Sequence, residues 1–112
     1  MALSDCIARV KEVLTGINVV DMEAPTEESG VFLLYEGFSK DSGVIVRNFG
    51  LYINGVSYNG KLGGLSQISQ IETALESASQ GLSDIGLRNG SIIDFKEDGT
   101  YSFRIVLTVQ EG

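Results

Sequence analysis

The chain has 112 residues, with 15 Asp and Glu against 8 Lys and Arg, and its formal net charge is −7. A chain of this length predicts a single domain, residues 1–112. The sequence has no His and no Trp, and its one cysteine is Cys6, which excludes His-dependent catalytic triads, His-based zinc sites and internal disulfides. The acidic balance argues against nucleic-acid binding through a basic surface.

The first predicted element is an amphipathic helix. Five apolar residues follow one another at steps of three and four: Leu3, Ile7, Val10, Leu14 and Ile17. Ser4 is the expected N-cap, and Gly16 is the expected stop. Cys6 lies beside the apolar stripe with Arg9 as its one basic neighbour, so we predict a buried thiol and not a reactive one.

The middle of the chain is rich in strand-forming residues. A short strand is expected over 18–23, and an acidic loop over 24–30 surrounds the only proline. Residues 31–36 predict a buried strand, followed by a turn within 38–43. Residues 44–53 predict a second strand, in which Gly50 marks a bulge or a close contact. Asn54-Gly55 predicts a tight hairpin if residues 56–58 pair back.

A second helix is predicted after the glycine-rich loop at 59–64. Its apolar positions again follow the helical period: Leu65, Ile68, Ile71, Leu75, Ala78, Leu82 and Ile85. Ser66 is the expected N-cap, and Gly81 and Gly86 mark the end of the helix.

The C-terminal segment gives the clearest strand pattern. Apolar residues alternate with other residues from Tyr101 to Val109, and Glu97-Asp98-Gly99 predicts the turn that joins this strand to residues 91–96. The order of helix, strands, helix and hairpin predicts an α+β fold, with two helices packed on one face of a mostly antiparallel sheet.

No catalytic, metal or cofactor motif is present. Glu27-Glu28 and Glu97-Asp98 are carboxylate pairs in a loop and a turn, without the ligand spacing of a calcium loop. The glycines at 60–64 lack the spacing of a phosphate-binding loop. We therefore expect a non-enzymatic protein without a cofactor, and carboxylate-only catalysis remains as an alternative.

The strand segments carry more apolar side chains than two helices are expected to cover. This surplus indicates that another chain covers part of the sheet, and a well-covered monomer is the alternative. Tyr52 and Tyr58 lie in these segments and are candidate interface residues. No apolar run reaches the length of a membrane span, and the N-terminus lacks the pattern of a signal peptide, so we expect no membrane partner and synthesis in a cytoplasm.

The order of these elements resembles that of the small tail-terminator, or tail-completion, proteins of tailed bacteriophages. The resemblance consists of an N-terminal amphipathic helix over 3–17, a Val-rich segment with an acidic Pro loop over 19–28, strands like 31–36 and 44–53, a long helix with Ile71-Glu72-Thr73-Ala74-Leu75, and a closing strand like 101–109. It covers nearly the whole chain, and it lies in element order and composition.

The resemblance implies a structural protein of the virion tail, assembled in the host cytoplasm. Its copies form a ring, usually a hexamer, that caps the tail tube protein and offers a docking surface to the neck or head-completion protein. DNA only passes through such a ring, and an acidic lumen would repel its phosphates. The candidate lumen or interface acids are Asp21, Glu23, Glu27 and Glu28. The alternative is a small acidic binding module or inhibitor that acts as a monomer or dimer.

Overall fold

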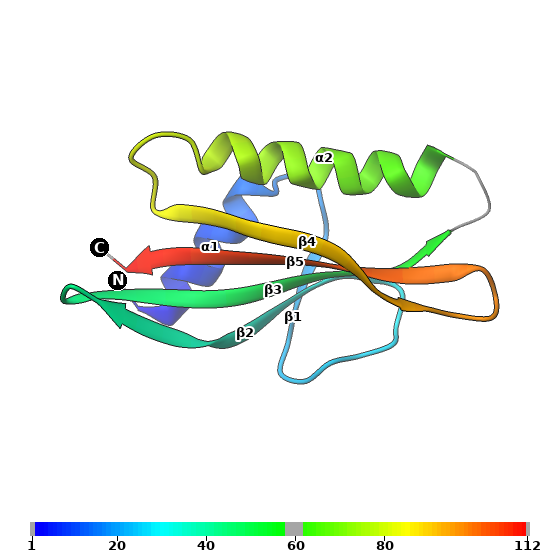
Figure 1. Ribbon diagram of the computed structural model, residues 1–112, viewed down its shortest axis with the longest axis horizontal. Helices are drawn as coiled ribbons and strands as arrows, with labels where there is room; N and C mark the ends of the chain where they lie inside the picture. The colour runs from blue at the N-terminus through cyan, green and yellow to red at the C-terminus, as the bar shows by residue number, and fades with distance from the viewer. Residues whose placement is uncertain (1, 58–61, 112) are drawn as a thin grey trace.

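The computed structural model describes residues 2–57 and 62–111 and contains two helices and five strands. In chain order these are α1 (Leu3–Val13), β1 (Val19–Met22), β2 (Gly30–Asp41), β3 (Val44–Ser57), α2 (Leu62–Ala78), β4 (Ile85–Phe95) and β5 (Thr100–Glu111). The strands form one sheet in the order β1-β2-β3-β5-β4 (Figure 1). β1 is parallel to β2, and the remaining neighbours are antiparallel. The expected α+β class with a mostly antiparallel sheet is confirmed.

Both helices pack on the same face of the sheet, as predicted. The shared core contains buried side chains from α1, from α2 and from the strands: Cys6, Val10, Leu14, Ile68, Ile71, Leu75, Val19, Val31, Leu33, Phe49, Leu51, Ile53, Val56, Ile85, Tyr101, Ile105, Leu107 and Val109. Because side chains alternate along a strand, the residues between these point to the opposite side of the sheet. We call the two sides the helix face and the open face.

The first helix begins earlier than its sequence suggests. Its N-cap is Ala2, whose backbone nitrogen donates to Oδ2 of Asp5 at 2.9 Å, and Ser4 lies inside the helix. Asp5 therefore satisfies the backbone at the helix start, and no serine cap is needed. Gly16 follows the helix with a φ of 92°, as expected of a stop signal.

The long central hairpin has its turn within the predicted range 38–43, and its two strands are longer than expected. β2 and β3 are joined by a two-residue turn at Ser42 and Gly43, which both have positive φ, as a type I′ turn requires. The predicted hairpin at Asn54-Gly55 is wrong. Gly55, with a φ of 74°, lies in a bulge of β3, and the strand continues because Val56 pairs with Tyr101 of β5.

The second helix and the strand after it also have shifted boundaries. α2 starts at Leu62, so Ser66 lies within it and is not its cap. The helix ends at Ala78, before Gly81 with its φ of 67°, and Ile85 belongs to β4. Ile85 is nevertheless buried in the core, because its strand position faces the same helices.

The predicted C-terminal hairpin is confirmed. β4 and β5 pair in antiparallel register up to Phe95 and Tyr101, and residues 96–99 form the turn. Neither helix in the described ranges has the length and apolar run that crossing a bilayer would require.

Candidate functional site

The candidate residues from the sequence lie in three separate places. Asp21 and Glu23 line a pocket of about 420 Å³ between α1 and the β1–β2 edge, whose floor includes Ile7 and Phe49. Oδ1 of Asp21 also forms an ion pair with Nζ of Lys11, at a distance of 2.9 Å. These two acids therefore lie on the helix face, and Lys11 of α1 partly neutralises the charge of Asp21.

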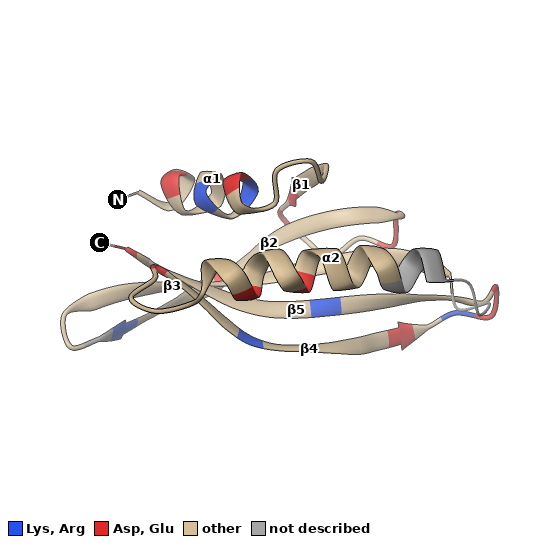
Figure 2. Cartoon of the chain, turned by 90° about the horizontal axis from the view of Figure 1, so that it is seen from above, with Lys and Arg blue, Asp and Glu red and all other residues tan. Residues whose placement is uncertain are grey.

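Glu27 and Glu28 lie in the loop before β2, near the β4–β5 turn. Oε2 of Glu27 is 3.8 Å from Nζ of Lys96, and the Glu27 side chain is 88% exposed. The loop is fastened to the sheet by Asn54, whose Nδ2 donates to the backbone oxygen of Thr26 at 2.9 Å. Figure 2 shows acidic residues in this loop and in the β4–β5 turn at one end of the sheet. Folding thus brings the two carboxylate pairs of the sequence to the same end of the molecule.

Tyr52 belongs to a polar cluster on the open face, together with Glu36 of β2 and Arg104 of β5. The Tyr52 hydroxyl donates to Oε2 of Glu36 at 3.0 Å and accepts from Nε of Arg104 at 3.1 Å. Nη2 of Arg104 contacts Oε1 of Glu36, and its guanidinium lies 5.8 Å from the centre of the Tyr52 ring. Tyr58, the sixth candidate, lies outside the described residues.

Gly50 makes room for this cluster. A Cβ at Gly50 would lie 2.8 Å from both Oε2 of Glu36 and Cε1 of Tyr52. Glu36 is the extra residue of a bulge in β2, and the bulge lets its carboxylate reach across β3. The predicted close contact at Gly50 is confirmed, and the bulge alternative at that residue is wrong.

The electrostatics of the cluster favour a charged guanidinium and a neutral phenol. Burial, followed by the hydrogen bond to Glu36, raises the pKa of Tyr52 above its ordinary value. The hydrogen bond to Glu36 raises the pKa of Arg104. All three groups contact one another, so the cluster ties β2, β3 and β5 together on the face opposite the two described helices.

A second arginine cluster lies on the helix face, at the end of the sheet away from the β4–β5 turn. Nη2 of Arg47 lies 2.9 Å from Oε2 of Glu111, and its Nη1 donates to the Tyr35 hydroxyl at 2.9 Å. The guanidinium also lies 5.6 Å from the ring centre of Phe38. The hydrogen bond to Tyr35 raises the pKa of Arg47, which keeps the guanidinium charged in this largely apolar setting.

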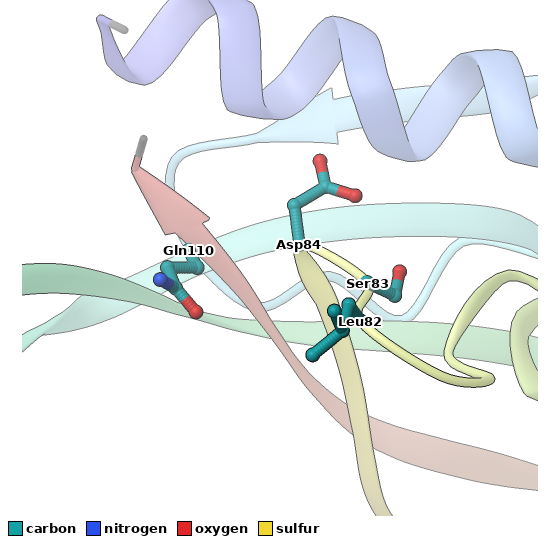
Figure 3. Close-up of a pocket in the computed structure, with 4 residues that line it drawn as sticks. All are labelled: Leu82, Ser83, Asp84 and Gln110. Atoms are coloured by element: carbon teal, nitrogen blue, oxygen red, sulfur yellow. The ribbon is translucent and has the colours of Figure 1, made fainter.

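A shallow pocket of about 270 Å³ lies at the segment between α2 and β4 (Figure 3). Its polar groups serve the local fold. The Ser83 hydroxyl accepts from the backbone nitrogen of Ile85 at 3.1 Å, and the backbone nitrogen of Gln110 donates to the backbone oxygen of Asp84 at 2.6 Å. In Figure 3 the Asp84 carboxylate points toward α1 and away from Leu82. Leu82 itself is fully exposed.

Sequence reasoning missed the outer edge of the sheet. Within the described ranges β4 pairs with β5 alone, so its other side is an open edge. Three large apolar residues near its end are exposed, namely Ile92 (41%), Ile93 (48%) and Phe95 (62%). These apolar residues indicate a strand over 91–96, but the position of that strand at the edge of the sheet is not readable from the sequence.

The described residues contain no group of three or more Cys, Asp and Glu placed to hold a metal ion. No protein-family model matches the chain, and no curated protein matches it significantly. The surfaces described above are therefore the basis for a functional proposal.

Proposed function

We propose that the chain is a non-enzymatic structural protein of a phage tail, a tail terminator whose copies form a ring that caps the tail tube and offers a docking surface to the neck. The order of helices and strands along the chain supports this assignment. The observation that carries it is a pair of exposed apolar residues on opposite sides of the sheet. Phe38 (62% exposed) lies on β2 beyond the residues that pair with β1, and Leu82 (fully exposed) lies just before the edge strand β4.

These two residues lie near the same end of the strands. Phe38 pairs with Arg47, Arg47 pairs with Val109, and Val109 pairs with Ile85, which follows Leu82 by three residues. One margin of the molecule can therefore contact the other margin of the next copy. A contact between two different patches repeats around an axis and closes into a ring when the rotation allows it.

The acidic end of the molecule fits passage of DNA through such a ring. Glu27, Glu28, Glu97 and Asp98 place four carboxylates there, and within the described part of the chain Lys96 is the basic residue beside them. In the proposed ring this end faces the pore and repels the phosphates of passing DNA. Asp21 and Glu23, on the helix face, belong to the contacts between subunits.

Electron microscopy of the purified chain, with light scattering across a range of concentrations, tests the proposal. We expect rings with a central pore, and we expect Phe38→Ser and Leu82→Ser to abolish them. Val20→Ser is the matched control, because Val20 is also exposed (44%) but lies on β1. A particle no larger than a monomer at all concentrations contradicts the ring. It favours the alternative of a small acidic binding module.

The gene neighbourhood gives an independent test of the tail assignment. Genes for a tail tube protein and a tape-measure protein beside this one are expected. A neighbourhood without phage structural genes contradicts the assignment, whatever the oligomeric state of the chain.

A further inference from the structure

The outer edge of β4 has the features of a self-complementary surface. The segment from Asn89 to Ile92 pairs regularly with β5, and a bulge flanks it on each side, at Arg88 and at Ile93. Its backbone groups on the outer side have no strand partner within the described ranges. An open edge of this length, with exposed apolar residues, is a template for pairing with another strand.

The residues of β4 divide between the two faces of the sheet. Leu87, Ile92 and Phe95 are opposite Leu107, Phe103 and Tyr101 of β5, which places them on the helix face. Ser91 and Asp94 are opposite Arg104 and Ser102, which places them on the open face. The guanidinium of Arg88 lies 3.9 Å from the place that a Cβ on Gly86 would take, and Gly86 is opposite Thr108, so the Arg88 side chain also lies on the open face.

We propose that β4 pairs antiparallel with β4 of a second copy, about a two-fold axis at Ser91. In this register Leu87 of each copy is opposite Phe95 of the other, and Gly90 is opposite Ile92. Each of these pairs joins residues of the helix face. A slip by one residue would set apolar residues of one copy against polar residues of the other.

The charges agree with the same register. Arg88 of each copy is opposite Asp94 of the other, so the two-fold axis generates two ion pairs on the open face. Neither residue makes an ion pair within its own chain among the described residues. Opposite charges across an antiparallel pair stabilise it, and like charges destabilise it.

The helix face offers space for the incoming side chains. A groove of about 300 Å³ lies along the β4 edge, with Leu87 and Ile105 among its lining residues and Glu72 and Glu76 of α2 at its border. Gly90 has no side chain, and a Cβ there would lie 2.9 Å from the ring of Phe103. The ring of Phe103 fills the space over Gly90, so Ile92 of the second copy packs against that ring. Phe95 of the second copy lies against Leu87 in the groove.

This pairing goes beyond the proposed ring and uses a different surface from Phe38 and Leu82. A two-fold contact and a ring contact on one chain together generate dihedral symmetry, in which two rings associate. The pairing also stands without the ring, in which case the chain is a dimer.

Charge exchange across the interface is the decisive test. Arg88→Asp and Asp94→Arg each place like charges opposite one another twice, and we expect each to weaken the dimer at least about tenfold in sedimentation equilibrium. The double variant Arg88→Asp/Asp94→Arg restores opposite charges, and we expect it to regain the affinity of the parent. Circular dichroism of the variants checks that each one folds. Single exchanges without effect, or a double variant no better than the singles, overturn the register.

A cysteine at the two-fold axis separates this pairing from the ring. Residues directly opposite in an antiparallel pair have Cα atoms about 4.5–5.5 Å apart, within the range of a disulfide. We expect Ser91→Cys to form a covalent dimer on oxidation, and Ser57→Cys, exposed on β3, to form no covalent dimer. Crosslinked dimers without rings support the pairing and contradict the ring. Rings that do not crosslink at position 91 overturn the pairing and leave the ring standing.

Discussion

Nε of Arg9 lies 3.1 Å from Oδ2 of Asp84, so an ion pair joins α1 to the segment between α2 and β4. The two residues are 75 positions apart, and their side chains are 32% and 29% exposed. The backbone of Asp84 also accepts from Gln110, so the same residue holds the end of β5. The pair therefore helps to fix α1 relative to the sheet.

Loss of this ion pair is expected to lower the stability of the fold modestly. Arg9→Ala and Asp84→Asn should each reduce the free energy of unfolding by about 1 kcal/mol, because the pair is hydrogen-bonded but partly exposed. The double variant should lose little more than either single variant, since both remove one interaction. Urea unfolding of the parent, the two single variants and the double variant measures these free energies. Glu12→Ala serves as the control, because Glu12 is 75% exposed and touches Arg9 only at 3.5 Å.

Truncation of the two leucines on either side of Gly81 is expected to change the free energy of unfolding by very different amounts. Leu75 belongs to α2 and is fully buried in the core, whereas Leu82 is fully exposed. Leu75→Ala should cost about 2–5 kcal/mol because it leaves a cavity in the core, whereas Leu82→Ala should change stability by less than about 0.5 kcal/mol. Urea unfolding at a protein concentration too low for association measures both. Equal losses would contradict the core assignment of α2.

The parts of the fold that could be predicted are those with a strict period. The apolar stripe of α1 and the alternation in β5 each bury one face of one element, so the sequence alone indicates them. Ile85 shows where this fails: its spacing continues the stripe of α2, yet it is buried from β4. Asn54-Gly55 fails for a different reason. A positive φ at Gly55 serves a bulge as well as a turn, and the partner strand that decides between them lies over 40 residues away.

The polar cluster on the open face could not be predicted. Glu36 and Arg104 are 68 residues apart, and they meet only because β5 inserts next to β3. The bulge that frees Glu36 has no distinct sequence signal beyond Gly37. Gly50 was a usable signal for close contact, although its partners depended on the strand order. The sequence puts the candidate acids in one group, but the folded chain separates them: Asp21 and Glu23 line the pocket beside α1, whereas Glu27 lies near Lys96 at the β4–β5 turn.

Gly50 is expected to be intolerant of a side chain. Gly50→Ala should lower the free energy of unfolding by about 1–3 kcal/mol, because its Cβ would displace Glu36 or the Tyr52 ring. The loss is steric, since the φ of Gly50 is not among the positive ones. In a chain that also carries Glu36→Ala, the same substitution should lower the free energy of unfolding by less. An equal loss in that background would contradict the role of Glu36.

Tyr52 is expected to make stability depend on alkaline pH. Its pKa is raised above the ordinary 10.0, so the unfolded chain loses the phenolic proton at a lower pH than the folded chain. Its contribution is present below about pH 10 and is lost as the pH rises through the folded-state pKa. Tyr52→Phe should lower stability by about 1 kcal/mol at neutral pH and show a smaller decline above pH 10. If the stability of the parent and that of the Tyr52→Phe chain fall equally above pH 10, the raised pKa of Tyr52 is contradicted.

Asp98 is expected to make the stability of the fold depend on pH in the acid range. Its Oδ1 accepts from the hydroxyl of Thr100 at 2.6 Å and from the backbone nitrogen of Thr100 at 3.0 Å, and these bonds hold the pKa of the carboxyl below its ordinary 3.8. Because the folded chain binds this proton less readily than the unfolded one, the stabilisation is present above pH 3.8 and is lost as the pH falls through the folded-state pKa.

Two substitutions at Asp98 separate hydrogen bonding from ionisation. Asp98→Asn keeps an acceptor for Thr100 but cannot ionise, so its unfolding midpoint should depend less on pH in the acid range than that of the parent. Asp98→Ala removes the acceptor as well and should be less stable than Asp98→Asn at neutral pH. Glu97→Gln, at the neighbouring turn position, should retain the acid dependence of the parent. If the Asp98→Asn chain loses stability in acid as steeply as the parent, the turn carboxylate is not the group that titrates.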